Sequence, residues 1–254
     1  MHEDLHLHPY KIQLVQALNP QDYAIRLGFC DTMLQLFEDD PQLIHNLWMS
    51  DEAHFHLSGY VNKQNYRYWA DANPHQLHER PLHSEKVTVW CAISSSGIIG
   101  PYFFEDANER AVTVTSERYV HMLDTFLIPE LQRFPANANT HFQQDGATSH
   151  TARVSMNTLR AIFPNRLISR NGYIHWPPRS PDLSSCDYFL WGYLKSKVFQ
   201  TRPATTQELK ERIQTEIRAI TPVVLRRVSE NLRTRFAQCV RENGRHLSGI
   251  IFKN

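Results

Sequence analysis

The chain has 254 residues, which is enough to bury a sizeable core and lies near the upper size of a single domain. Its composition, 41% hydrophobic and 21% charged, is that of a globular protein and excludes a disordered or fibrous chain. The net charge of +1 conceals a gradient, because residues 1–60 hold nine acidic and two basic residues whereas residues 191–254 hold thirteen basic and five acidic. A basic C-terminal side favours a polyanionic partner.

The cysteines and the N-terminus bear on the compartment. The four cysteines lie far apart with no CxxC pair, so neither a thiolate zinc site nor a disulfide framework is predicted. The first residues, MHEDLHLHPY, are acidic and polar where a signal peptide would be basic and then apolar, and no apolar run approaches the ~20 residues of a membrane span. We therefore expect an intracellular protein without membrane association.

The first predicted helix begins at Asn19-Pro20, where a capping residue precedes a proline, and it continues to the acidic residues 38–40. A short second helix is expected from Pro41. The next segment, LWMSDEAHFHLSG, predicts a strand whose alternation places Asp51 on the apolar face. An ionised carboxylate in that position is costly unless a cation compensates it.

The middle of the chain alternates strands and helices. Residues 86–93 and 97–104 are β-branched and aromatic runs joined by three serines, which predicts a β-hairpin. A helix capped at Thr115-Ser116 follows, then a short strand at THFQQ and another helix from Ser149.

Asp145 lies directly after that short strand, in the stretch FQQDGATSH. An Asp-Gly pair is a favoured hairpin turn, so a turn residue is the structural alternative to a metal ligand. The helix predicted from Ser149 stands where a second hairpin strand would be, which weakens the turn interpretation.

Residues 175–199, HWPPRSPDLSSCDYFLWGYLKSKVF, are the most unusual stretch. Three prolines stiffen the approach, Ser184 or Ser185 can cap, and a helix follows. Asp187 falls in its first turn, in line with apolar residues at helical spacing. The structural alternative is that an acid there suits the helix dipole.

Two basic amphipathic helices, separated at Thr221-Pro222, complete the chain after the strand-like segment ISRNGYIHW and the helix of Asp187. The whole order predicts an α/β fold with a sheet covered by helices on both faces.

Asp51, Asp145 and Asp187 each have a structural explanation, but together they suggest a magnesium site. Hard divalent cations take carboxylate oxygens, and such ions are often paired across a phosphate in nucleases and polymerases. Carboxylates packed together without a cation would repel one another and stay partly protonated.

Three segments carry a family resemblance. SDEAHFHLSGYVN, FQQDGATSHTA and WPPRSPDLSSCDYFLW resemble the catalytic blocks of mariner-type transposases, over roughly residues 45–200. The resemblance implies an RNase H-like mixed β-sheet flanked by helices on both faces, with an aspartate triad at positions 51, 145 and 187. The 41 residues between the last two aspartates are more than in mariner elements proper, and the family pattern makes Asp182, the competing third ligand, a turn or cap residue.

The same resemblance implies the function and its requirements. We expect a transposase that cleaves and joins DNA strands with Mg²⁺ or Mn²⁺, acts on transposon ends and target DNA, needs no small-molecule substrate and is located in the nucleus. A homodimer is left open. The alternative is an inactive or host-co-opted remnant that only binds nucleic acid.

The predicted organisation has three parts: a linker with N-terminal helices (1–44), the catalytic domain (45–200) and basic C-terminal helices packed on it (201–254). The family's paired helix-turn-helix modules are not found ahead of residue 45, where LHPYKIQLVQAL resembles the family linker. We therefore expect a chain without its sequence-reading modules.

Several arginines are candidates for phosphate contacts, which supply affinity without reading sequence. Solvated helix faces with ion pairs are the alternative for those on the C-terminal helices. Beside the third block, Arg179 and Trp176 are near enough in sequence to touch a DNA end, although packing is favoured for Trp176. The C-terminal candidates are Arg226, Arg227, Arg233, Arg235, Arg241 and Arg245.

Histidines offer a second metal hypothesis. His54 and His56 share a strand face, and His141 and His150 flank Asp145, so a zinc hydrolase is the runner-up. Surface histidines need no metal, however. The absence of a glycine-rich phosphate loop or a GxSxG elbow argues against an NTPase or a serine hydrolase.

Overall fold

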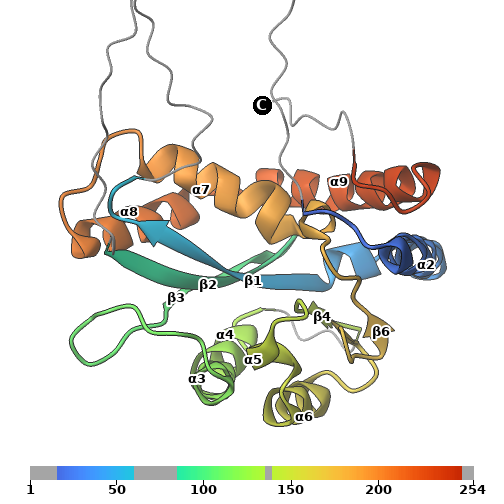
Figure 1. Cartoon of the computed structure of the whole chain (residues 1–254), viewed down its shortest axis with the longest axis horizontal. Helices are drawn as coiled ribbons and strands as arrows, with labels where there is room; N and C mark the ends of the chain where they lie inside the picture. The colour runs from blue at the N-terminus through green and yellow to red at the C-terminus, as the bar shows by residue number, and fades with distance from the viewer. Residues whose placement is uncertain (1–15, 60–84, 135–138, 248–254) are drawn as a thin grey trace, which may run out of the picture.

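A six-stranded mixed sheet organises the chain in the order β3-β2-β1-β4-β5-β6 (Figure 1). The computed structural model describes residues 16–59, 85–134 and 139–247. The N-terminal histidines and most of the linker-like segment therefore lie outside the described residues. The strands are β1 (Leu47–His56), β2 (Lys86–Ser94), β3 (Gly97–Phe103), β4 (His141–Gln143), β5 (Leu167–Ser169) and β6 (Ile174–His175).

Strand directions divide the sheet into two halves. The hairpin predicted at residues 86–104 is confirmed, since β2 pairs antiparallel with β3, and β2 also pairs antiparallel with β1. From β1 onward the pairing is parallel, through β4 and β5 to β6. The segment ISRNGYIHW, predicted as one strand, forms two short parallel strands because a tight turn interrupts it.

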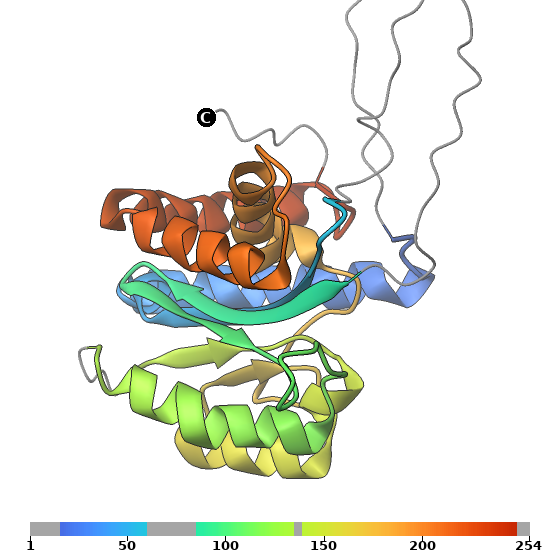
Figure 2. The same cartoon turned by 90° about the vertical axis from the view of Figure 1, so that its left-hand side faces the viewer.

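Helices cover both faces of the sheet, as predicted from the order of the elements (Figures 1 and 2). One layer contains α2, α7, α8 and α9, and the other contains α3, its continuation through η3 and α4, and α6. The helices are α2 (Pro20–Asp39), η1 (Leu43–His45), α3 (Ser116–Met122), η3 (Leu123–Leu127), α4 (Ile128–Leu131), α5 (Thr148–Thr151), α6 (Arg153–Ile162), η4 (Pro181–Leu183), η5 (Cys186–Leu190), α7 (Trp191–Val198), α8 (Thr206–Ala219) and α9 (Pro222–Arg241). Among the described residues, none of these helices has the length and apolar character needed to cross a bilayer.

The alternation predicted for β1 is confirmed by the two cores. Met49 and Phe55 point into the core beneath α2 and α7–α9, and Trp48 points into the core over α3 and α6. Each buried side chain of this size contributes about 1.5–3 kcal/mol relative to exposure. Because β1 is buried on both faces, its register against β4 is strongly fixed.

Helix caps follow the predicted signals in part. Thr115, Thr205 and Thr221 accept the backbone N–H three residues on, at α3, α8 and α9. Ser185 holds the cap position before η5 but makes no side-chain cap. Its hydroxyl lies 3.1 Å from the Tyr188 hydroxyl instead.

A buried arginine joins three distant segments. Arg26 on α2 is fully buried, and its guanidinium donates to both carboxylate oxygens of Asp182, at 2.8 and 2.6 Å. It also donates to the Ser180 hydroxyl (2.7 Å) and to the carbonyl of Gly244 (2.8 Å) beyond α9. The segment SPDL is therefore held against α2 and the C-terminal side of the fold, and Asp182 is occupied as a structural partner.

We predict that Arg26→Met destabilises the protein by about 3–5 kcal/mol, because it leaves the Asp182 carboxylate buried without its cation. The urea midpoint measures this effect. The matched control is Arg227→Met on the exposed face of α9, expected within about 0.5 kcal/mol of the wild type. Equal midpoints for the two variants would contradict the role assigned to Arg26.

Candidate functional site

Asp51 and Asp145 come together through strand register. Pairing of β1 with β4 places Met49 opposite Gln143. Two residues beyond this pair, Asp51 lies within β1 and Asp145 lies in the segment that follows β4. Because the two strands are parallel, the fold brings these two carboxylates, which are distant in sequence, to the same end of the strands.

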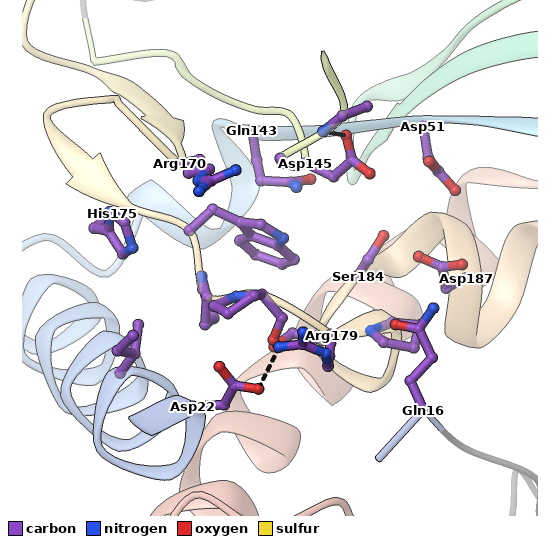
Figure 3. A pocket seen from close by; sticks show the side chains of 18 of the residues that line it. Gln16, Asp22, Asp51, Gln143, Asp145, Arg170, His175, Arg179, Ser184 and Asp187 are labelled. Atoms are coloured by element: carbon purple, nitrogen blue, oxygen red, sulfur yellow. Dashed lines mark hydrogen bonds and ion pairs between the residues drawn. The ribbon is translucent and has the colours of Figure 1, made fainter. Parts of the chain in front are cut away.

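Asp187 approaches from the helix that covers this face. The Cys186 thiol donates to the carbonyl of Met49 (3.3 Å), and the Trp191 indole N–H donates to Asp51 Oδ2 (2.8 Å). Asp187, in η5, lies in sequence between Cys186 and Trp191, the two residues that make these contacts. All three aspartates line one pocket of about 950 Å³, and Figure 3 shows Asp187 facing Asp51 across it.

The carboxylates influence one another's charge. Burial raises the pKa of Asp51 well above its ordinary value, and the charges of Asp187 and Glu52 raise it further. Burial likewise raises the pKa of Asp187 to about 6, with a contribution from the charge of Asp145. These shifts are those of negative groups held together without a compensating cation.

His150 on α5 (Thr148–Thr151) orients Asp145. Its Nδ1 lies 2.6 Å from Asp145 Oδ1 and its Nε2 lies 2.9 Å from Glu52 Oε1, and the ring is 1% exposed. Burial opposes protonation, but the charge of Glu52 and hydrogen bonds to both carboxylates raise the pKa of His150 to about 10. Both ring nitrogens therefore donate, since ionised carboxylates only accept. Despite burial, the hydrogen bond from His150 lowers the pKa of Asp145.

The donor set suits a hard divalent cation. In the parts of the chain that the structure describes, no three His, Cys, Asp or Glu side chains already surround a common point. Asp145 is turned toward His150, and Asp51 toward Trp191. Even so, three carboxylates line one pocket, and two of them have raised pKa values that a cation would relieve. The residues therefore fit Mg²⁺ or Mn²⁺ by their chemistry.

The histidines do not form the zinc site of the runner-up hypothesis within the described residues. His54 Nδ1 lies 3.1 Å from the Thr88 hydroxyl, and His141 Nδ1 lies 2.8 Å from the carbonyl of Asn139. His150 is occupied by two carboxylates, so it serves the aspartate site instead.

The predicted phosphate contacts fall into two groups. Arg226, Arg227 and Arg233 are exposed on α9, where no ion pair involves them among the described residues. Arg179 lines the pocket, but its guanidinium is bound to Asp22 at 2.6 Å.

Arg235 is wrong as a phosphate-contact candidate. It is 5% exposed, it donates to the carbonyl of Asp182 (3.0 Å), and it lies over the Tyr188 ring at 4.0 Å. Trp176 is also buried, with its ring 5.1 Å from that of Phe29, as the packing interpretation predicted.

Two residues at or near the pocket were missed from the sequence. Glu52 lies on the other face of β1 from Asp51, and it joins the site only because His150 reaches it. Arg170 follows β5 and lines the pocket beside Gly146. Arg170 could have been found because it follows the strand next to the one that precedes Asp145. Recognising this requires the order of the strands in the sheet, which the sequence alone does not give.

The fold defines a class: a mixed sheet with helices on both faces, as in RNase H-like domains. Solved structures of this class are similar to the chain. The Mos1 transposase paired-end complex with the left transposon end matches 96% of this chain and 69% of its own, with a TM-score of 0.77 and 23% identity. The catalytic domain of Mos1 mariner transposase matches over 93% of this chain and all of its own, with a TM-score of 0.70 and 20% identity.

The Mos1 mariner paired-end complex with Mn gives a TM-score of 0.77 at 22% identity, covering 97% of this chain and 70% of its own. No protein-family model and no curated protein matches the chain. The likeness establishes the fold predicted from the sequence, an RNase H-like sheet of the kind found in a mariner transposase.

We predict that Asp187→Asn raises the melting temperature in metal-free buffer at pH 7.5 more than at pH 4.5. The folded-state pKa of Asp187, about 6, lies above the ordinary value of 3.8, so ionisation costs folding energy that appears as pH rises from about 4 through 6. Asn removes that cost.

The matched control is Asp124→Asn on the exposed side of η3. This control variant should change the melting temperature by the same small amount at both pH values. A gain for Asp187→Asn that is larger at pH 4.5 than at pH 7.5 would refute the raised pKa that burial and the charge of Asp145 give to Asp187.

Proposed function

We propose that this chain is the catalytic domain of a mariner-type DNA transposase, which cleaves phosphodiester bonds at transposon ends and joins the freed strand to target DNA. One observation carries the proposal: three aspartates from three separate elements line one pocket. The fold around that pocket is shared with Mos1 transposase, whose solved forms include a strand transfer complex.

Asp51, Asp145 and Asp187 are the residues that would hold a pair of Mg²⁺ or Mn²⁺ ions. When bound, such ions supply Lewis acidity and a reactive hydroxide at neutral pH. The chain's own contribution is orientation. Trp191 holds one oxygen of Asp51, and His150 holds one oxygen of Asp145, which leaves the other oxygen of each for a ligand.

The reaction follows from a positioned phosphodiester. Attack by water in line with the leaving oxygen breaks the P–O bond and releases a 3′-hydroxyl. That hydroxyl then attacks a phosphodiester of target DNA, so one bond forms as another breaks. Positioning and charge neutralisation account for catalysis of this kind, and no covalent bond to the protein is needed.

Binding of DNA away from the pocket is assigned to α9. Arg226, Arg227 and Arg233 lie on its exposed face and are available for phosphate contacts. Such contacts give sequence-indifferent affinity that falls as salt rises. A nuclear location and a homodimer stay predictions of the family resemblance.

The second candidate is a remnant that binds nucleic acid without cleaving it. All three aspartates of the pocket are present, and Trp191 and His150 each bind only one oxygen of Asp51 and Asp145. A complete set of carboxylates with oxygens left for a ligand favours the enzyme.

We predict that the protein nicks supercoiled plasmid DNA with Mn²⁺ or Mg²⁺ but not with EDTA. Asp145→Asn should reduce nicking at least 100-fold, because the amide removes the charge that attracts the ion. A plasmid is used because nicking it does not depend on recognition of a particular end. Gel analysis at saturating metal measures the rate.

Asp124→Asn, a charge change on exposed η3, is the matched control and should nick at the wild-type rate. Undiminished nicking by Asp145→Asn would place the chemistry elsewhere. Tight plasmid binding without nicking at any metal concentration would favour the binding remnant.

A further inference from the structure

The pocket that contains Asp51 and Asp145 extends to the end of β5. Pairing of β4 with β5 places Gln143 opposite Ile168. Asp145 and Arg170 lie two residues beyond this pair, in the segments that follow the two parallel strands. Arg170 therefore lines the pocket beside the proposed catalytic carboxylates, next to the segment of Asp145.

Local packing holds Arg170 in that position. Its aliphatic carbons lie 3.4–4.0 Å from the point where a Cβ on Gly146 would stand, so the stem runs over the residue after Asp145. The turn that follows is tight: the Gly172 N–H donates to the carbonyl of Ser169 (3.0 Å). A Cβ on Gly172 would collide with the carbonyl of Leu167, so the turn requires glycine.

The guanidinium of Arg170 is available. Among the residues that the structure describes, no ion pair or hydrogen bond engages it, although Asp145 is its neighbour. Arg179, on the far side of the pocket, is instead neutralised by Asp22. Arg170 is thus a pocket-lining cation whose charge is not used by the protein.

Gln143 supplies a second, independent sign of a ligand. It is 1% exposed and lines the pocket, yet its side-chain carbonyl oxygen has no hydrogen-bond donor within the described residues. In Figure 3, Gln143 lies between Asp145 and Arg170 along one wall. A buried acceptor without a donor is costly, so this oxygen calls for a donor that the described residues do not supply.

A nucleotide unit has both complementary groups. Its phosphate oxygens accept from a guanidinium, which binds phosphate with two parallel hydrogen bonds. Its hydroxyl and base N–H groups are donors that satisfy an amide carbonyl.

We infer that Arg170 forms a phosphate subsite next to the carboxylates, where it binds the DNA backbone within a few nucleotides of the bond that is cleaved. The inference rests on the proposed function. Arg170 is here a positioning residue: it sets the strand in register with Asp51 and Asp145, while the aspartates act on the reacting phosphate. The DNA strand then runs along the pocket past the ends of β1, β4 and β5.

The test measures binding to a duplex that already ends in a 3′-hydroxyl, so that no cleavage is needed. Single neutral methylphosphonates replace the first, second or third phosphate from that end. The wild type is compared with Arg170→Met, which keeps the aliphatic stem over Gly146 but removes the charge. Arg133→Met, outside the pocket at the end of α4, is the matched control.

We expect Arg170→Met to weaken binding about tenfold and Arg170→Lys to recover part of the loss. One methylphosphonate position should weaken wild-type binding by a similar factor but leave Arg170→Met unaffected. Arg133→Met should respond to every methylphosphonate as the wild type does.

The subsite would be overturned if each methylphosphonate reduced the DNA affinity of the wild type and of Arg170→Met by the same factor. It would also be overturned if Arg170→Met bound the unmodified duplex as tightly as the wild type does. The plasmid-nicking assay separates the two proposals. If the protein nicks plasmid DNA but Arg170→Met responds to every methylphosphonate as the wild type does, the subsite alone is rejected. If one methylphosphonate weakens binding by the wild type but not by Arg170→Met, and no nicking is seen, the catalytic function is rejected and the phosphate contact stands.

Discussion

The parallel register of β1, β4 and β5 is the constraint on which the site depends. It aligns the end of β4 with Met49 of β1 and with Ile168 of β5, so that Asp51, Asp145 and Arg170 lie two residues beyond the paired positions, at the same end of the strands. A slip of one residue in β4 would shift Asp145 out of this arrangement. Burial of β1 on both sides prevents such a slip, because Trp48 and Met49 each occupy a separate core. The packing of the sheet thus also positions its polar residues.

The third aspartate depends on a different device. Asp187 belongs to the segment after β6, which has no strand partner to fix it. Arg26 binds this segment at Ser180 and Asp182 and connects it to the end of α9. A buried ion pair adds little net stability over apolar packing, but it tolerates few alternative arrangements. The Arg26–Asp182 ion pair therefore explains how the proline-rich loop is held so that Asp187 lies beside the sheet.

Local patterns in the sequence were enough to predict most elements, and together with the family resemblance they singled out the three aspartates that line the pocket. The alternation of β1 placed Asp51 among apolar residues, and the proline-rich approach to a helix marked Asp187. Strand order and partners over long distances have no local signal, so the position of Arg170 in the pocket was not predicted. The role of Arg26 also has no local signal, since its partners lie more than 150 residues away. Charge pattern alone also could not separate buried Arg235 from the exposed arginines of α9.

We propose that Asp51, Asp145 and Asp187 together bind a pair of divalent cations, and anomalous diffraction from crystals soaked in Mn²⁺ is the direct test. We expect two Mn²⁺ peaks about 3.5–4 Å apart in the pocket, with Asp51 between them and Asp145 and Asp187 on either side. Saturated crystals with no peak among these carboxylates, or with ions bound only at other residues, would contradict it.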